Sequence, residues 1–61
     1  MENIKDVLMR RDGLTGTQAD KLITEAQLQF DSYLAEGEEE MAYNICQEFF
    51  GLEPDYLVEF F

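Results

Sequence analysis

One apolar stripe constrains this chain more than any other feature of its sequence. Between residues 16 and 36, apolar side chains recur at every third or fourth position. At about 100° per residue they fall within an arc of about 120°, which is typical of a helix face that packs on a core. The stripe consists of Ala19, Leu22, Ile23, Ala26, Phe30, Tyr33 and Leu34. We therefore expect a helix over residues 16–36, and the remainder of the 61-residue chain must pack against it.

Residues that begin and end helices delimit the stripe and its neighbours. Thr15 and Gln18 have the spacing of a capping box, in which each side chain accepts a hydrogen bond from a free backbone amide. Gly13 and Gly51 suit the left-handed position that follows a helix end. Pro54 suits the first turn of a helix, where its missing N–H is not needed. These signals predict three further helices, at residues 2–11, 38–50 and 54–60.

The expected fold is all-α: a compact bundle of three helices plus a short C-terminal fourth helix, forming one small helical domain over residues 1–61. Phe30, Ile45 and Phe49 lie at the centres of their helix stripes and should fill the core. Cys46 shares the inward face, and the chain has no second cysteine and no histidine. We therefore expect a buried structural thiol, and neither a disulfide framework nor a Cys/His zinc site.

Charge is distributed unevenly along the chain. It holds 14 Asp and Glu against 4 Lys and Arg, for a formal net charge of −10. All the bases lie in residues 1–21 with an equal number of acids, so residues 22–61 carry the whole excess. Phosphate groups bind through cations, so this charge disfavours direct contact with nucleic acid or with an anionic membrane. It favours a protein partner with a basic surface.

Targeting signals are not evident in the sequence. The first residues do not combine basic side chains with a following apolar run, and no apolar stretch is long enough for a membrane span. The expected location is the cytoplasm.

Pairs of carboxylates are the candidate groups for a catalytic or metal site in this sequence. Glu48 with Glu53, and Asp55 with Glu59, are examples. Solvated acids are the simpler interpretation, because catalytic carboxylates need a pocket that moves their pKa values apart. We expect no enzyme activity, no metal and no cofactor, and keep an enzyme or metal-binding protein as the alternative of another class.

Two segments carry a resemblance to a known group of proteins. They are residues 11–15 (RDGLT), which open the long helix, and residues 50–57 (FGLEPDYL). With them the chain resembles short acidic proteins encoded by bacteriophages, prophages and other bacterial mobile elements, over nearly its whole length. That group carries no assigned activity. The resemblance therefore implies a phage-like origin and a host-directed accessory role, and it transfers no catalytic or binding residue.

The candidate binding residues are acids around one apolar side chain. Leu28 lies opposite the apolar stripe of the long helix, and Asp31 follows it by three positions. Glu39 and Glu40 begin the next helix, where the helix dipole favours negative charge. We predict a non-enzymatic protein that binds another protein through this exposed helical face, with Leu28 as the anchor. The alternative is an acidic surface that mimics nucleic acid and inhibits a host DNA- or RNA-binding defence protein.

The last residues leave the oligomeric state open. Tyr56, Leu57, Phe60 and Phe61 either close over the other helices or form a dimer seam. We expect a monomer or a weak homodimer.

Overall fold

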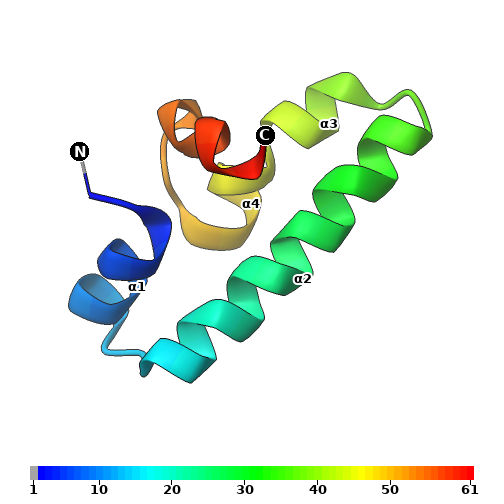
Figure 1. Cartoon of the computed structure of the whole chain (residues 1–61). Coiled ribbons are helices and arrows are strands. Elements are labelled where there is room, and N and C mark those ends of the chain that lie inside the picture. Colours follow the sequence, from blue (N-terminus) through cyan, green and yellow to red (C-terminus); the bar gives the residue numbers. More distant parts are fainter. Residues whose placement is uncertain (1) are drawn as a thin grey trace.

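Residues 2–61, the part of the chain that the computed structural model describes, form helices joined by short connecting segments, with no strand among them (Figure 1). Met1 lies outside it. The elements are α1 (Ile4–Asp12), α2 (Gly16–Ala35), α3 (Glu39–Tyr43), α4 (Ile45–Phe50) and the 3-10 helix η1 (Pro54–Phe60). In Figure 1, α2 runs the length of the molecule, and α1, α3, α4 and η1 all lie on one side of it, α1 near its beginning and α3 near its end. The predicted all-α class is confirmed.

At the first two helices the predicted signals at Gly13, Thr15 and Gln18 are confirmed, whereas α1 begins at Ile4 rather than at residue 2. Asn3 caps α1, its Oδ1 accepting a hydrogen bond from the Asp6 amide at 2.8 Å. Gly13 ends α1 with φ 69°, a left-handed conformation that glycine adopts without strain. The capping box is complete: the Gln18 amide donates to Thr15 Oγ1 at 3.1 Å, and the Thr15 amide donates to Gln18 Oε1 at 3.0 Å. The chain therefore turns from α1 into α2 within three residues.

The single helix predicted over residues 38–50 is wrong, because the chain forms two helices that meet at Asn44. The Asn44 amide donates to the Met41 carbonyl, three residues back, at 3.2 Å, where an α-helix would bond four residues back. Asparagine is a weak helix former, since its side chain competes for backbone hydrogen bonds. The break lets both α3 and α4 press their apolar sides on α2, with Ala42 and Ile45 each completely buried.

The expected core centre at Phe49 also needs correction. Phe49 is half-buried, whereas its neighbour Phe50 is 3% exposed. The buried residues of α4 are Ile45, Cys46 and Phe50, so Phe50 and not Phe49 is the aromatic residue of α4 that reaches the core centre. Phe30 and Ile45 are buried as predicted.

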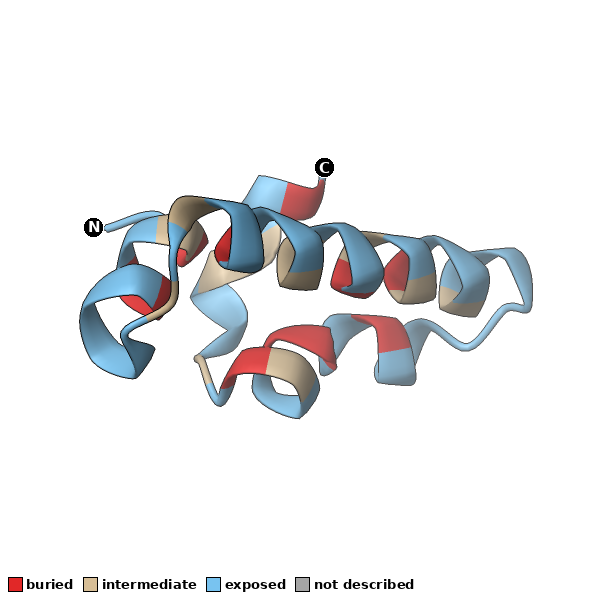
Figure 2. Cartoon of the chain, turned by 90° about the horizontal axis from the view of Figure 1, so that it is seen from below, coloured by how far each residue is buried: buried red, intermediate tan, exposed pale blue. Residues whose placement is uncertain are grey.

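The C-terminal helix is a 3-10 helix, in which residues three apart lie on the same side. Leu57 and Phe60 therefore both face the core: Leu57 is half-buried, and Phe60 is buried. The Phe60 ring stacks on Phe30 with centroids 5.5 Å apart and on Phe50 at 6.4 Å. Three aromatic rings from α2, α4 and η1 thus form the centre of the fold. Figure 2 shows the buried bands of α2 turned toward the other helices and its outer turns exposed.

Two hydrogen bonds between distant residues fasten helix ends. The Ile4 amide at the start of α1 donates to both carboxylate oxygens of Glu59 on η1, at 3.1 and 3.0 Å. Arg11 Nη2 donates to the Phe50 carbonyl at the end of α4, at 2.6 Å. In each case the charge has the sign that the helix dipole favours, negative at an N-terminus and positive at a C-terminus.

Candidate functional site

The predicted anchor Leu28 is on the outer face of α2, where 66% of it is exposed. Asp31 lies one turn further along and is also exposed. Gln27 Nε2 donates to Asp31 Oδ1 at 3.1 Å and to the Phe60 carbonyl at 3.4 Å. Asp31 is therefore held beside the end of η1 as well as beside Leu28.

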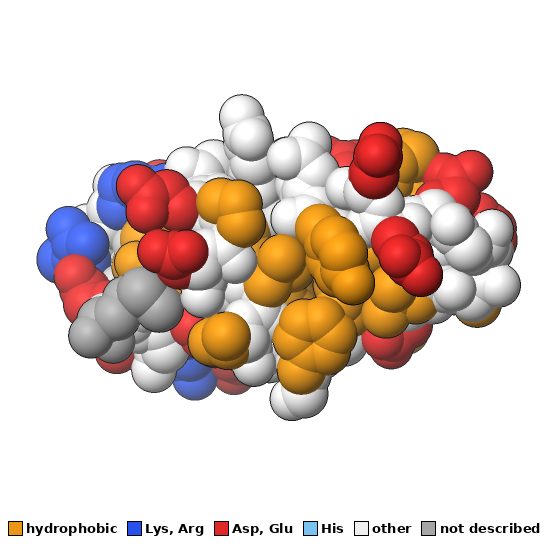
Figure 3. All heavy atoms as spheres, turned by 90° about the horizontal axis from the view of Figure 1, so that it is seen from above, with side chains coloured by type: hydrophobic (Ala, Val, Ile, Leu, Met, Phe, Trp, Pro, Cys, Tyr) orange, Lys and Arg blue, Asp and Glu red, His pale blue; other side chains and the backbone are white. Residues whose placement is uncertain are grey.

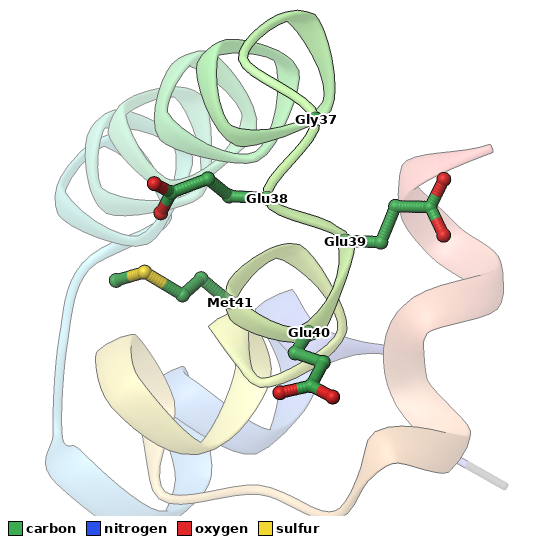
Figure 4. Close-up of a pocket in the computed structure, with 5 residues that line it drawn as sticks. All are labelled: Gly37, Glu38, Glu39, Glu40 and Met41. Carbon is green, nitrogen blue, oxygen red and sulfur yellow. The ribbon is translucent and has the colours of Figure 1, made fainter.

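The predicted residues Glu39 and Glu40 form the first turn of α3, after the tight turn at Gly37. With Gly37, Glu38 and Met41 they line an open surface hollow of about 450 Å³ (Figure 4). Figure 4 shows their carboxylates diverging: Glu38 points toward the α2 side, Glu39 points toward the side on which η1 lies, and Glu40 points away from both. Divergent carboxylates make a charged surface and do not converge on one ligand.

The four predicted residues do not form one cluster. Leu28 is on the side of α2 opposite Phe30, whereas α3 packs on the core side of α2 through its buried Ala42. Among the described residues, no hydrogen bond links Leu28 or Asp31 with Glu39 or Glu40. The structure thus presents an anchor with one neighbouring acid on α2, and a separate acidic turn at the start of α3.

The charge asymmetry of the sequence becomes a spatial asymmetry. All ten acids of residues 22–61 are exposed, and that stretch contains no Lys or Arg. The ion pairs of the described chain join residues 2–20 only: Lys5 with Asp20, Arg10 with Glu2 and Arg11 with Asp12. In the face shown in Figure 3, the basic side chains gather at one end beside acids, and the other end shows acids without bases. The acids of residues 22–61 therefore carry charge that no ion pair within residues 2–61 neutralises.

Titratable groups near the core show no pairing that suggests acid–base chemistry. Burial raises the pKa of the Cys46 thiol, and the nearby Glu59 carboxylate raises it further, so the thiol is held in its unreactive protonated form. Partial burial raises the pKa of the Tyr33 hydroxyl, and Glu48, which accepts its hydrogen bond at 3.4 Å, adds to the shift.

Residues 2–61 lack the features of a metal site and of a membrane span. That range holds no group of three or more Asp, Glu or Cys side chains arranged to bind a metal ion. Its helices are too short or too polar to cross a membrane. Its buried residues are all hydrophobic.

A second apolar surface lies at the C-terminal end, and sequence reasoning found only part of it. Phe60 is buried and Tyr56 is half-buried, so neither is free for a partner, whereas Phe61 is 79% exposed and Val58 is 68% exposed. Leu34 on α2 is 38% exposed. We call the exposed side chains of Leu34, Val58 and Phe61 the C-terminal apolar face. The spacing of three between Val58 and Phe61 is the signal that would have shown them on one side of a 3-10 helix.

Comparison of the chain with protein-family models, with curated proteins and with solved structures finds no match.

Proposed function

We propose that this chain is a non-enzymatic acidic interaction protein that binds another protein with a basic surface through an exposed helical face. The observation that carries the proposal is the set of ten exposed acids in residues 22–61, a stretch without a single Lys or Arg. Uncompensated charge of one sign attracts an oppositely charged partner over long range and raises the rate of encounter. The resemblance to phage and mobile-element proteins supports a host protein as the partner.

The acidic turn of α3 is the strongest local source of this attraction. Glu38, Glu39 and Glu40 are consecutive, exposed and directed to different sides (Figure 4). They attract a basic surface and so raise the rate of encounter, but they do not form a closely packed contact. Retention then requires an apolar anchor, because a few central apolar residues contribute most of the binding free energy of a typical interface. Leu28 remains the anchor predicted from the sequence.

Mimicry of nucleic acid is the sharper form of the same proposal. The molecule is 34 Å long. Duplex DNA carries one charge per about 1.7 Å, so the same length of duplex carries about 20 charges. The chain has a net charge of −10, about half of that number. This density supports attraction to a basic groove more strongly than a close imitation of a duplex.

Charge reversal with a matched control tests the proposal. The chain, carrying an affinity tag, is used to capture proteins from a lysate of its native host, and the captured proteins are identified by mass spectrometry. Glu39→Lys should lower the association rate with the captured partner, and higher salt should lower the wild-type rate. Asp6→Lys is the control, since Asp6 is also exposed and also lies in the first turn of its helix, but in the charge-balanced part of the chain.

The outcomes separate the alternatives. If neither salt nor Glu39→Lys changes the association rate of the captured partner, the proposed role of charge is contradicted. Displacement of the partner by a DNA or RNA oligonucleotide supports mimicry, and a captured partner that nucleic acid does not displace supports the broader form.

A further inference from the structure

The C-terminal apolar face draws its side chains from two parts of the chain. Val58 lies on η1, and Phe61, three residues later, directly follows the last residue of η1. The Phe61 ring meets the Phe30 ring edge-on, with centroids 5.3 Å apart, while most of Phe61 stays exposed. Leu34 lies one turn after Phe30 on α2. Figure 3 shows hydrophobic side chains gathered in the middle of this side of the molecule.

Acids border this face. Asp31 is joined to η1 through Gln27, which donates hydrogen bonds to Asp31 and to the Phe60 carbonyl. Asp55 precedes Val58 by three residues and so shares the outer side of η1. Glu39 extends toward the side where η1 lies (Figure 4). All three acids are exposed, and none has an ion-pair partner in residues 2–61.

The apolar centre and the acidic border together favour one kind of partner. A second copy of the chain would bring a net charge of −10 against an acidic border, and an anionic membrane would be repelled in the same way. A partner segment with apolar side chains flanked by Lys or Arg would cover the apolar centre and neutralise the border together. Helix-in-groove recognition of amphipathic segments has this arrangement of anchors and charges.

We propose that the C-terminal apolar face, bordered by Asp31, Glu39 and Asp55, is the docking surface for a basic amphipathic helix of another protein. The inference rests on the proposed function and goes further, since it names the anchors and the chemistry of the partner. Val58 and Phe61 bury against the apolar side of the incoming helix, and the three carboxylates pair with its cations. Leu28 is not one of the residues of this face, and is then not the anchor.

A defined probe tests this inference without knowledge of the natural partner. The probe is a fluorescent synthetic helical peptide of Leu and Lys, with the Leu residues on one face, and its binding is followed by fluorescence anisotropy. Val58→Ser and Phe61→Ser should each raise the Kd roughly fivefold to tenfold, because each removes an apolar contact. Met9→Ser, which removes a side chain 41% exposed on α1, should leave the Kd unchanged. Circular dichroism checks that every variant keeps the wild-type fold.

The possible results distinguish failure of the inference from failure of the proposed function. If the wild type binds the peptide in a salt-dependent way but Val58→Ser and Phe61→Ser do not weaken it, the inference is overturned and the proposed function stands. A loss of affinity in Leu28→Ser alone also overturns it and assigns the anchor to Leu28. If the wild type does not bind the peptide at all, both fail. A wild-type dimer in sedimentation that Val58→Ser dissociates would assign the face to a second copy and overturn the inference as well.

Discussion

Residues 2–21 and residues 22–61 both contribute apolar side chains to the core, but their charges are arranged differently. In the first region the bases Lys5, Arg10 and Arg11 each form an ion pair within residues 2–20. The second region has ten exposed acids and no base, yet it supplies all the aromatic rings of the core. The larger region is therefore held together by apolar packing, which outweighs the repulsion among its own charges. Its charge is therefore not explained by stability, which is why we assign it to binding.

Two hydrogen bonds join the regions, and in each a charged side chain of one region bonds to a backbone group at a helix end of the other. Glu59, from the acidic region, accepts from the Ile4 amide, and Arg11, from the balanced region, donates to the Phe50 carbonyl. These contacts lie at helix ends whose dipoles favour the respective charges. Substitutions in each region test whether packing and charge stabilise the two regions as this difference implies.

The largest expected effect is in the aromatic core. Phe30→Ala removes a ring that is 1% exposed and stacks on Phe60, and it should cost about 3–5 kcal/mol. At about 0.05–0.15 kcal/mol per residue, a domain of this length has about 3–9 kcal/mol in total. Thermal unfolding followed by circular dichroism should show a largely unfolded or strongly destabilised protein.

Two further aromatic substitutions serve as controls for that result. Phe61→Ala, at an exposed ring that touches Phe30, should cost much less than Phe30→Ala. Phe50→Ala should cost more than Phe49→Ala, since only Phe50 is buried. A cooperative melt of Phe30→Ala within a few degrees of the wild type would contradict the assigned core.

A smaller effect is expected at the junction of the two regions. Arg11→Met removes the hydrogen bond to the Phe50 carbonyl together with the pair to Asp12, so it should lower the Tm. Arg10→Met is the matched control, because Arg10 contacts only the exposed Glu2 and its loss should change the Tm less. Equal Tm values for the two variants would show that the contact between Arg11 and α4 does not stabilise the fold.

Salt should act oppositely on the two regions. Screening shortens the range of charge interactions from about 30 Å at 0.01 M to about 8 Å at 0.15 M, which relieves repulsion among the unpaired acids and weakens the ion pairs of residues 2–20. Because the unpaired acids outnumber those pairs, the Tm should rise over this range. Replacing Glu39 and Glu40 by Gln should reduce the rise, whereas a Tm that falls with salt would mean that local attraction outweighs repulsion.

The smallest expected effect is the pH dependence of one exposed pair. The Arg11 guanidinium, through its hydrogen bonds at 2.9 Å, lowers the pKa of Asp12 below its usual value. The charged form is thus favoured in the folded state, so the contribution is complete above the unfolded pKa of about 3.9 and is lost as pH falls through the folded pKa. Asp12→Asn should lower the Tm slightly at pH 7, and the difference from the wild type should shrink as the pH falls from about 4 toward 2. A Tm difference that persists unchanged at pH 2 would contradict this linkage.

Much of the fold follows from local patterns. The stripe of α2, the capping box at Thr15 and the glycines after α1 and α4 act over a few residues, and they have the predicted effect. The predicted exposure of Leu28 and of the acids around it is likewise found. Periodicity is reliable for these features because a helix face and a helix cap depend on residues within one or two turns.

The sequence by itself determined that this protein is helical, that its long helix begins at residue 16, and that its acidic excess lies in residues 22–61. Only the tertiary structure decided that the helical segment after Gly37 is interrupted at Asn44, that Phe50 is more deeply buried than Phe49, and that Val58 is exposed while Leu57 is half-buried. Each of these depends on which side of a short helix meets α2. A helix of five to seven residues is not stable alone, so packing against distant residues sets its hydrogen bonding and its rotation.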